Sequence, residues 1–447
     1  MERITVTRGG DLVWSAEDLE VRLCRALDLA EKVLDNFAVD GFVDAETPVY
    51  NFGPEKAIAE TAMLAYTASS VSTRPAVKVR VDALARHLTR VARSDRMLVE
   101  LALHPSLAFK FALPHILLSH MGYRDAEFDG FLRVCLSADT INGHDRSPTA
   151  ALERDWLYSL WSGNGSIATV ANETTHSILN GPLDILGGLR DDVYAFTHVM
   201  FYISDFGNTA PTLPRPQSVL LAEAEGLLAR YIDAEDYDLT GEILLAWPFT
   251  QVDWSPAAAF TFRVLARVED AVGLLPCGNV DLHRLARFDG ADRSRYALGM
   301  AYHTAYVMGF LSAAALRTGR TPPSRIIGWV SDSSCVEQVL KYLDDDQGHW
   351  QTDFASLPAD EQRALTSFAL SIALIQKCRR RDYQSVLELL RIAADHQLAA
   401  HPVCRQAAEL LDRIAGCSSV LTAVLRKNTQ QQSLIPQSLH AVRRIGE

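Results

Sequence analysis

Three segments of the sequence are almost free of charge, yet each carries one or two side chains able to do chemistry. They are residues 164–180, 193–206 and 296–316, whose only ionisable groups apart from tyrosines are Glu173 and His176, His198 and Asp205, and His303, respectively. A helix that is apolar on all sides is buried on all sides. An unpaired charge in such surroundings costs several kcal/mol or is neutralised by a pKa shift. We therefore expect these groups to bond to one another, to bind a ligand or to line a wet cavity.

One chemistry open to these residues is metal binding. Two histidines and a carboxylate can hold non-haem iron or another divalent ion. We therefore predict His176, His198 and Asp205 as ligands of Fe or Zn, with His303 as a further donor. The spacing from Glu173 to His176 matches the E-x-x-H of di-iron bundles, although the sequence offers no suitable second copy.

The alternative chemistry needs no cofactor. At about 100° per residue, His198, Tyr202 and Asp205 fall on one face of a helix. Asp205 would orient or charge His198, and Tyr202 would donate a hydrogen bond. The remaining catalytic candidates, Tyr302, His303 and Glu173, are carried by the other two segments.

Aromatic residues gather in the same part of the chain. Fifteen of the 37 Phe, Trp and Tyr residues fall between positions 156 and 262. Such clustering suits an apolar ligand cavity, for which we predict walls formed by Trp156, Trp161, Trp247 and Trp254. The cavity would take a small, largely apolar substrate for cyclisation, isomerisation or oxidation.

A non-catalytic function fits the same residues. Buried His–Asp and His–Tyr pairs often serve only as core hydrogen-bond partners, as in a helical scaffold or a ligand-binding protein. A separate acidic run has five carboxylates in ten residues, at Asp233, Glu235, Asp236, Asp238 and Glu242. These could bind Mg²⁺ and a diphosphate, but a solvated acidic loop is the commoner outcome.

Helical periodicity dominates the elements that would position these groups. Ser15 can cap a helix with Asp18 three residues on, and Ser147-Pro148 is a cap followed by proline in the first turn. Helix follows helix with short loops, which predicts an all-α toroid of antiparallel helix pairs. We expect a short hairpin or arm at 1–14, the toroid with its central cavity at 15–325, and a C-terminal helical layer and tail at 326–447.

Composition excludes several classes of function. The net charge is −12, with 43 Lys and Arg against 55 Asp and Glu, so nucleic acid and anionic membranes are poor partners. The run 296–316 is long enough to cross a bilayer, but its three tyrosines and one histidine favour a buried central helix. Seven scattered cysteines and an N-terminus without an apolar core predict a cytoplasmic protein, for which a homodimer is an open option.

Two motifs carry a resemblance to a known family. The segment Tyr194-Ala-Phe-Thr-His198-Val-Met-Phe-Tyr202-Ile-Ser-Asp205-Phe-Gly207 and the segment Tyr302-His303-Thr-Ala-Tyr306-Val-Met-Gly309 resemble an uncharacterised family of all-helical actinobacterial proteins. Members of that family are soluble and often encoded beside specialised-metabolite genes. The resemblance implies a biosynthetic enzyme, and it assigns no catalytic residue.

Overall fold

Helices form nearly all of the secondary structure. The computed structural model describes residues 15–44, 52–163, 176–278, 280–328, 331–344 and 348–432, with side chains through residue 417. Within these ranges the only β pairing is an isolated bridge between Phe42 and Phe52. The predicted all-α class is confirmed, while the predicted hairpin at 1–14 lies outside the described residues.

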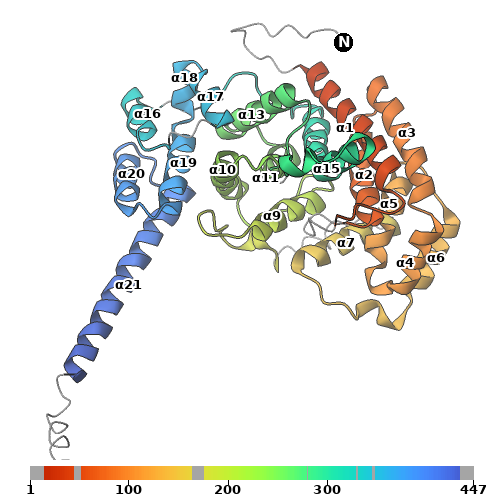
Figure 1. The fold of residues 1–447 in the computed structure, drawn as a ribbon, viewed down its shortest axis with the longest axis horizontal. Coiled ribbons are helices and arrows are strands. Elements are labelled where there is room, and N and C mark those ends of the chain that lie inside the picture. The colour runs from red at the N-terminus through yellow and green to blue at the C-terminus, as the bar shows by residue number, and fades with distance from the viewer. Residues whose placement is uncertain are drawn as a thin grey trace, which may run out of the picture.

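The main body of the molecule runs from α1 to α15 (Figure 1). Its α-helices are α1 (Ala16–Phe37), α2 (Pro54–Ser69), α3 (Pro75–Val91), α4 (Asp95–Leu103), α5 (Ala108–His120), α6 (Ala126–Leu136), α7 (Pro148–Ser162), α9 (Arg190–Ile203), α10 (Gln217–Asp233), α11 (Tyr237–Leu244), α12 (Ala246–Thr250), α13 (Pro256–Val272), α14 (Leu282–Leu285) and α15 (Gly290–Ala315). Short 3₁₀ turns are η2 (Pro105–Leu107), η3 (Asp139–Asn142) and η5 (Ile178–Asn180).

A second group of helices follows the main body. These are α16 (Ser333–Leu340), α17 (His349–Ala355), α18 (Ala359–Ala364), α19 (Thr366–Arg379), α20 (Tyr383–Asp395) and α21 (Pro402–Gln432). Helix α19 packs on α10 and is flanked by α16, α20 and α21, so these helices form a layer on one side of the body. The far end of α21 leaves this layer and extends away from it (Figure 1).

Helix α15 occupies the centre of the main body. It packs against α1, α2, α11 and α12, and its residues from Thr304 to Ala315 are all buried. This agrees with a sequence that is apolar on every side from residue 296 onward. Gly309 permits the closest approach, because a Cβ there would overlap Ala26 of α1 and Leu64 of α2.

Local signals in the sequence fix where several helices begin. Ser15 and Asp18 form the expected capping box of α1, and Ser147 caps α7 with Pro148 in the first turn. One predicted helix is not formed over its described part. Residues 164–175 lie outside the description, and the end of that segment is the 3₁₀ turn η5 rather than an α-helix. Gly181 and Pro182 follow at once, and proline disfavours helical backbone in the residue before it.

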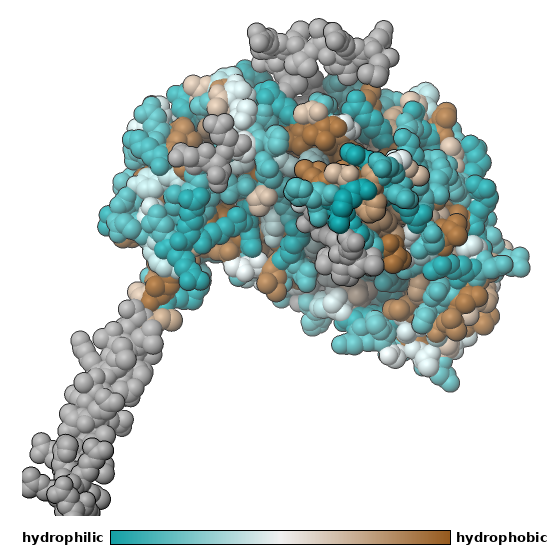
Figure 2. Space-filling model, in the orientation of Figure 1, coloured by the Kyte–Doolittle hydropathy of each residue, from teal (hydrophilic) through white to brown (hydrophobic). Residues whose placement is uncertain are grey.

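The face drawn in Figure 2 is mainly hydrophilic, and its apolar residues stand in separate patches. Within the described ranges no single helix, α15 included, is long and apolar enough to span a membrane. One bent pair, Asp95–Leu103 with Pro105–His120, meets the length and composition required only when both helices are taken together.

Candidate functional site

His303 of α15 stands among three carboxylates from two other helices. Its Nδ1 lies 3.2 Å from Glu60 Oε2. Its Nε2 lies 3.6 Å from Asp238 Oδ1 and 3.5 Å from Glu242 Oε1. Glu60 belongs to α2, whereas Asp238 and Glu242 belong to α11. The two ring nitrogens of His303 therefore face different acids, and we call these four residues the His303 cluster.

The two acids on α11 reach His303 because α11 and α15 pack closely. Asp238 and Glu242 are four residues apart, so their side chains project from the same face of the helix. Gly241 lies between them, and a Cβ at this position would overlap Val307, one turn beyond His303 on α15. Like charges at this spacing repel each other. Positive charge between the two acids is therefore favoured.

Hydroxyl groups of α9 fix both of these acids. Tyr194 donates a hydrogen bond of 2.7 Å to Asp238 Oδ2, and Thr197 donates one of 2.6 Å to Glu242 Oε2. In each acid the other oxygen faces Nε2 of His303, and that of Asp238 also accepts a 3.4 Å hydrogen bond from the Thr304 hydroxyl. The surrounding helix thus orients two carboxylate oxygens and one imidazole nitrogen toward a common point.

The charges of the cluster shift the pKa values of His303, Glu60 and Glu242. Burial alone would lower the pKa of His303, but the negative charges of Glu60, Asp238 and Glu242 raise that pKa well above its usual value. Burial alone would raise the pKa of Glu60, but His303 and Lys56 lower it to about 2. The pKa of Glu242 is also lowered, because contacts with His303 outweigh its burial. At neutral pH the cluster therefore holds an imidazolium beside the ionised carboxylates of Glu60 and Glu242.

Several buried polar atoms at the cluster are not satisfied. Glu60 Oε2, His303 Nδ1 and the hydroxyl of Tyr302 have no aligned hydrogen bond, although the first two atoms lie within ion-pair distance. Tyr302 is only 2% exposed. A buried polar group without a partner costs about 1–3 kcal/mol. A buried group that lacks an aligned hydrogen bond requires an explanation, and a bound water or ion is one such explanation.

A cavity of about 770 Å³ opens onto the cluster. Its size lies within the range of small-molecule sites. Aromatic, cationic and acidic residues share its wall, and they include Phe52, Lys56, Glu60, Arg190, Tyr194, His198, Tyr237, Asp238, Tyr302 and His303. Glu242 is 3% exposed and lies behind this wall. The cavity is therefore more polar than the aromatic-lined hollow that the sequence predicts.

The structure brings some of the predicted catalytic residues to this cavity. His198, Tyr302 and His303 all line it. His198 also contributes electrostatically to the lowered pKa of Glu242, after the larger effects of burial and of the hydrogen bond with His303. Tyr202 points elsewhere, because its hydroxyl donates a 3.0 Å hydrogen bond to Glu153 of α7.

Asp205 does not take its predicted place on the face of α9. The helix ends at Ile203, and Asp205 has a left-handed backbone with φ of 50°, so helical spacing no longer applies to it. Its Oδ1 accepts hydrogen bonds from Trp156 Nε1 at 2.9 Å and from the Tyr66 hydroxyl at 3.0 Å. Asp205 is therefore a hydrogen-bonded core residue.

The metal set predicted from the sequence is not assembled. His176 is exposed, Asp205 is buried against Trp156 and Tyr66, and Glu173 lies outside the described residues. In the part of the chain that the structure describes, the three residues whose ligand atoms all lie within 4.8 Å of one another are Asp238, Glu242 and His303. Of these three, only His303 was predicted as a donor to Fe or Zn, whereas Asp238 and Glu242 belong to the acidic run considered for Mg²⁺.

None of the four tryptophans predicted to line the cavity does so. Trp156 bonds to Asp205, Trp161 Nε1 donates to Asp129, and Trp254 Nε1 donates to the carbonyl of Arg320. Trp247 is 1% exposed and belongs to the hydrophobic core. Their clustering in sequence reflects core packing.

Three of the four cluster residues, Glu60, Asp238 and Glu242, lie outside the three apolar segments from which the site was predicted. Asp238 and Glu242 stand in the acidic run, for which a solvated loop seemed the commoner outcome, but the second half of that run is helix α11. The useful signal is their i, i+4 spacing directly before the apolar residues 243–249. Glu60 is the only acid between residues 57 and 68 of α2, which is the same signal that drew attention to His303.

The fold and the cluster define an all-helical protein with a partly buried carboxylate–histidine site beside a cavity. The chain belongs to the family described as a domain of unknown function (DUF6895), whose model matches residues 23–313. That range ends within α15 and contains all four residues of the His303 cluster. No curated protein and no solved structure matches the chain.

Proposed function

We propose that this protein is a divalent-metal-dependent enzyme whose metal is held by Asp238, Glu242 and His303. One observation carries the proposal: each of the three side chains offers one atom to a common point, while its other polar atom faces a separate group. Tyr194 holds Asp238, Thr197 holds Glu242, and Glu60 faces the far nitrogen of His303. Ligand histidines usually have a carboxylate or carbonyl at their second nitrogen.

The spacing of the three atoms also favours a metal. In a tetrahedral site with bonds of about 2.1 Å, neighbouring ligand atoms are roughly 3.4 Å apart. The Nε2 atom of His303 lies 3.5 and 3.6 Å from the two carboxylate oxygens. Direct charge-assisted hydrogen bonds are shorter, at about 2.7–2.9 Å. A central ion fits these separations better than direct pairing does.

The donor types narrow the choice of ion. Imidazole suits Zn and Fe, whereas carboxylates also suit Mn and Mg. A mixed set with one imidazole and two carboxylates therefore favours Zn²⁺, Fe²⁺ or Mn²⁺ over Mg²⁺ or Ca²⁺. This retains the Fe or Zn expected from the sequence, although it moves the metal to different residues.

The surrounding residues suggest the kind of substrate. Bound at this point, an ion with three protein ligands would polarise a substrate oxygen in its open position. The hydroxyl of Tyr302 lines the same cavity next to Glu60, and Lys56 and Arg190 add positive charge to the wall. We therefore propose a small polar substrate with oxygen ligands in place of a largely apolar one.

Further features expected from the sequence belong to the same proposal. We propose that α2, α9, α11 and α15 surround the cavity as part of a ring of helix pairs. A biosynthetic role, a cytoplasmic location and a dimeric state stay predictions. In the alternative function, a non-catalytic ligand-binding protein, the metal and the cavity would be kept but no substrate would be consumed.

The function is tested with metal-loaded protein and a small-molecule extract of the source organism. Wild-type protein with Zn²⁺, Fe²⁺ or Mn²⁺ should consume at least one compound that persists with the Glu242→Gln variant under the same conditions. Mass spectrometry of the extract gives the readout. If the protein binds metal but the extracts treated with wild type and with the variant stay identical, the proposed function is that of a binding protein and not of an enzyme.

Metal binding is expected to release a proton at neutral pH. The raised pKa of His303 keeps its imidazole protonated in the metal-free protein, and an imidazolium cannot bind a metal. The lowered pKa values of Glu60 and Glu242 keep these two acids ionised, so they contribute no proton. Calorimetric titration in buffers of different ionisation enthalpy should therefore show about one proton released per metal, with an affinity that rises with pH. A result of zero protons would contradict a role for His303 as ligand.

Loss of the Tyr194 hydroxyl should weaken the metal. Outer partners of metal ligands typically contribute about 10- to 100-fold to affinity. We expect this loss for Tyr194→Phe, because Asp238 then loses its shortest hydrogen bond and keeps only the longer contacts with Thr304 and Arg190. Tyr237→Phe is the matched control, since Tyr237 lines the same cavity but its hydroxyl bonds to His349. Equal metal affinity in the two variants would count against the proposed orientation of Asp238.

A further inference from the structure

A second cavity, distinct from the one at His303, lies between α7 and the start of α5. It measures about 480 Å³ and is bounded by η2, η3, α5 and α7. Much of its wall is apolar, with Leu107, Phe109, Ile141, Leu157 and Tyr158 among the lining residues. The residues of the His303 cluster do not line it.

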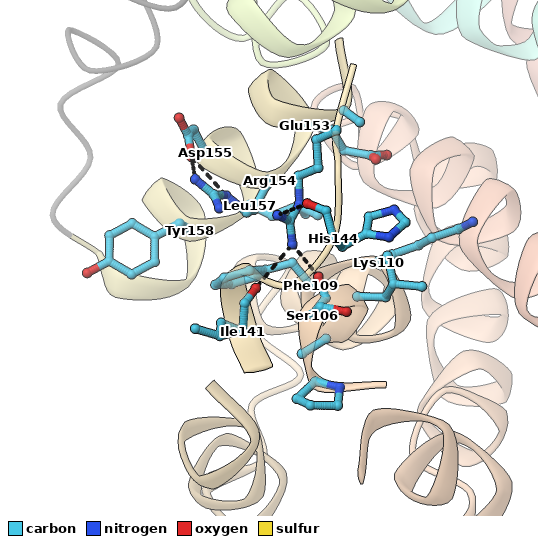
Figure 3. A pocket seen from close by; sticks show the side chains of 15 residues that line it. Ser106, Phe109, Lys110, Ile141, His144, Glu153, Arg154, Asp155, Leu157 and Tyr158 are labelled. Carbon is cyan, nitrogen blue, oxygen red and sulfur yellow. Dashed lines mark hydrogen bonds and ion pairs between the residues drawn. The ribbon is translucent and has the colours of Figure 1, made fainter. Parts of the chain in front are cut away.

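Most charged groups of this wall are already paired. Arg146 donates to the backbone carbonyls of Ser106, Ile141 and His144, and Arg154 bonds to Asp155. Figure 3 shows both sets of contacts, with the Arg154–Asp155 pair at the opposite end of the view from Lys110. These arginines hold the wall together and are not free to bind a ligand.

Glu153 is the exception among the acids. Its Oε1 accepts one hydrogen bond, from Tyr202 behind the wall. Among the described residues no cation is close enough to form an ion pair with Glu153, and burial raises its pKa against the opposing effects of Tyr202, His198 and Lys110. Lys110 is exposed and hydrated, so its charge costs little. The desolvated carboxylate is the group whose charge needs a partner.

We propose that this cavity binds a small organic ammonium ion, with its charged group at Glu153 and its apolar body against Phe109, Leu157 and Tyr158. A carboxylate in low-dielectric surroundings is stabilised by a nearby cation more strongly than in water. Contact of the apolar body with Phe109, Leu157 and Tyr158 removes apolar surface from water and adds to the affinity. The proposal is independent of the metal site, since the two cavities share no cluster residue.

Calorimetric titration of the full-length protein with three probes of similar shape tests the ligand class. We expect 2-phenylethylamine to bind saturably at one site, and 2-phenylethanol and 3-phenylpropionate to bind about tenfold more weakly or not at all. Equal binding of the alcohol would show a merely apolar hollow. Tighter binding of the acid would show a site for anions. Either result, or no binding of the amine, overturns the proposal.

Variants test the role of Glu153. Glu153→Gln should weaken 2-phenylethylamine about tenfold or more, the usual effect of losing a charged hydrogen bond. Asp155→Asn is the matched control and should leave affinity unchanged, because Asp155 is already neutralised by Arg154. Lys110→Ala removes a positive charge that repels the ammonium group, so the affinity for 2-phenylethylamine should be equal or higher. Unchanged affinity in Glu153→Gln, or a loss in Lys110→Ala, contradicts the proposal. If Glu153→Gln does not fold, the proposal is tested by the wild-type protein alone, which should bind 2-phenylethylamine more tightly than 2-phenylethanol.

Discussion

Replacing Glu242 by glutamine is expected to remove stoichiometric metal from the protein. The substitution keeps the shape of the side chain and its contact with Thr197, but it replaces an anionic ligand by a weak neutral one. Asp238 and His303 would then be the only strong donors left in the set. We expect wild-type protein to take up one Zn²⁺ or Mn²⁺ per chain. The variant should retain less than about a tenth of that after dialysis, which corresponds to a loss of more than about 1.4 kcal/mol in binding free energy. Elemental analysis by mass spectrometry measures the content.

Glu235→Gln provides the matched control for this experiment. Glu235 lines the same cavity and precedes the same helix, but its carboxylate pairs with His349 rather than with His303. It should retain full metal content. Loss of metal in both variants would indicate nonspecific attraction by the acidic wall. Full metal in Glu242→Gln would place the ion elsewhere.

Replacing Asp205 by alanine should produce the largest loss of stability without loss of metal. The carboxylate accepts hydrogen bonds from Trp156, Tyr66 and Asn208, and its removal leaves the first two donors buried and unpaired. Each orphaned donor costs about 1–3 kcal/mol, so we expect a decrease of about 3 kcal/mol in the free energy of unfolding. Urea denaturation followed by fluorescence measures this change.

The conservative variant Asp205→Asn tests whether the chemistry of the Asp205 side chain accounts for this loss of stability. Asp205→Asn keeps an acceptor oxygen and a residue type that tolerates positive φ, so its loss should be clearly smaller than that of Asp205→Ala. Both variants should bind metal as the wild type does. If Asp205→Ala is as stable as wild type but fails to bind metal, the catalytic or ligand role predicted from the sequence would be restored.

Much of the helical framework could be predicted because its signals are local. In caps such as Ser15 with Asp18, side chains form hydrogen bonds with backbone groups that lie within four residues of them. The apolar sides of α15 directly indicate that the helix is buried. The importance of His303 follows from the same argument, since a titratable group in such a helix must find a partner. These inferences need no knowledge of which helices meet.

The partners of His303 could not be predicted in this way. Glu60 and Asp238 lie 243 and 65 residues away in sequence (303 − 60 and 303 − 238), and only the packing of α2 and α11 on α15 brings them together. The prediction that Asp205 lies on the face of α9 was wrong for a different reason. Its spacing from His198 is helical, but α9 ends two residues earlier, and helix ends are poorly fixed by periodicity.

The central claim is that one divalent ion sits between Asp238, Glu242 and His303. Anomalous X-ray diffraction from crystals soaked in Mn²⁺ or Zn²⁺, recorded above and below the absorption edge of the metal, locates the ion directly. The account predicts a single strong peak within about 2.0–2.3 Å of His303 Nε2 and of one oxygen from each acid. A peak at other side chains with none at these three, or no peak at saturating metal, would contradict it.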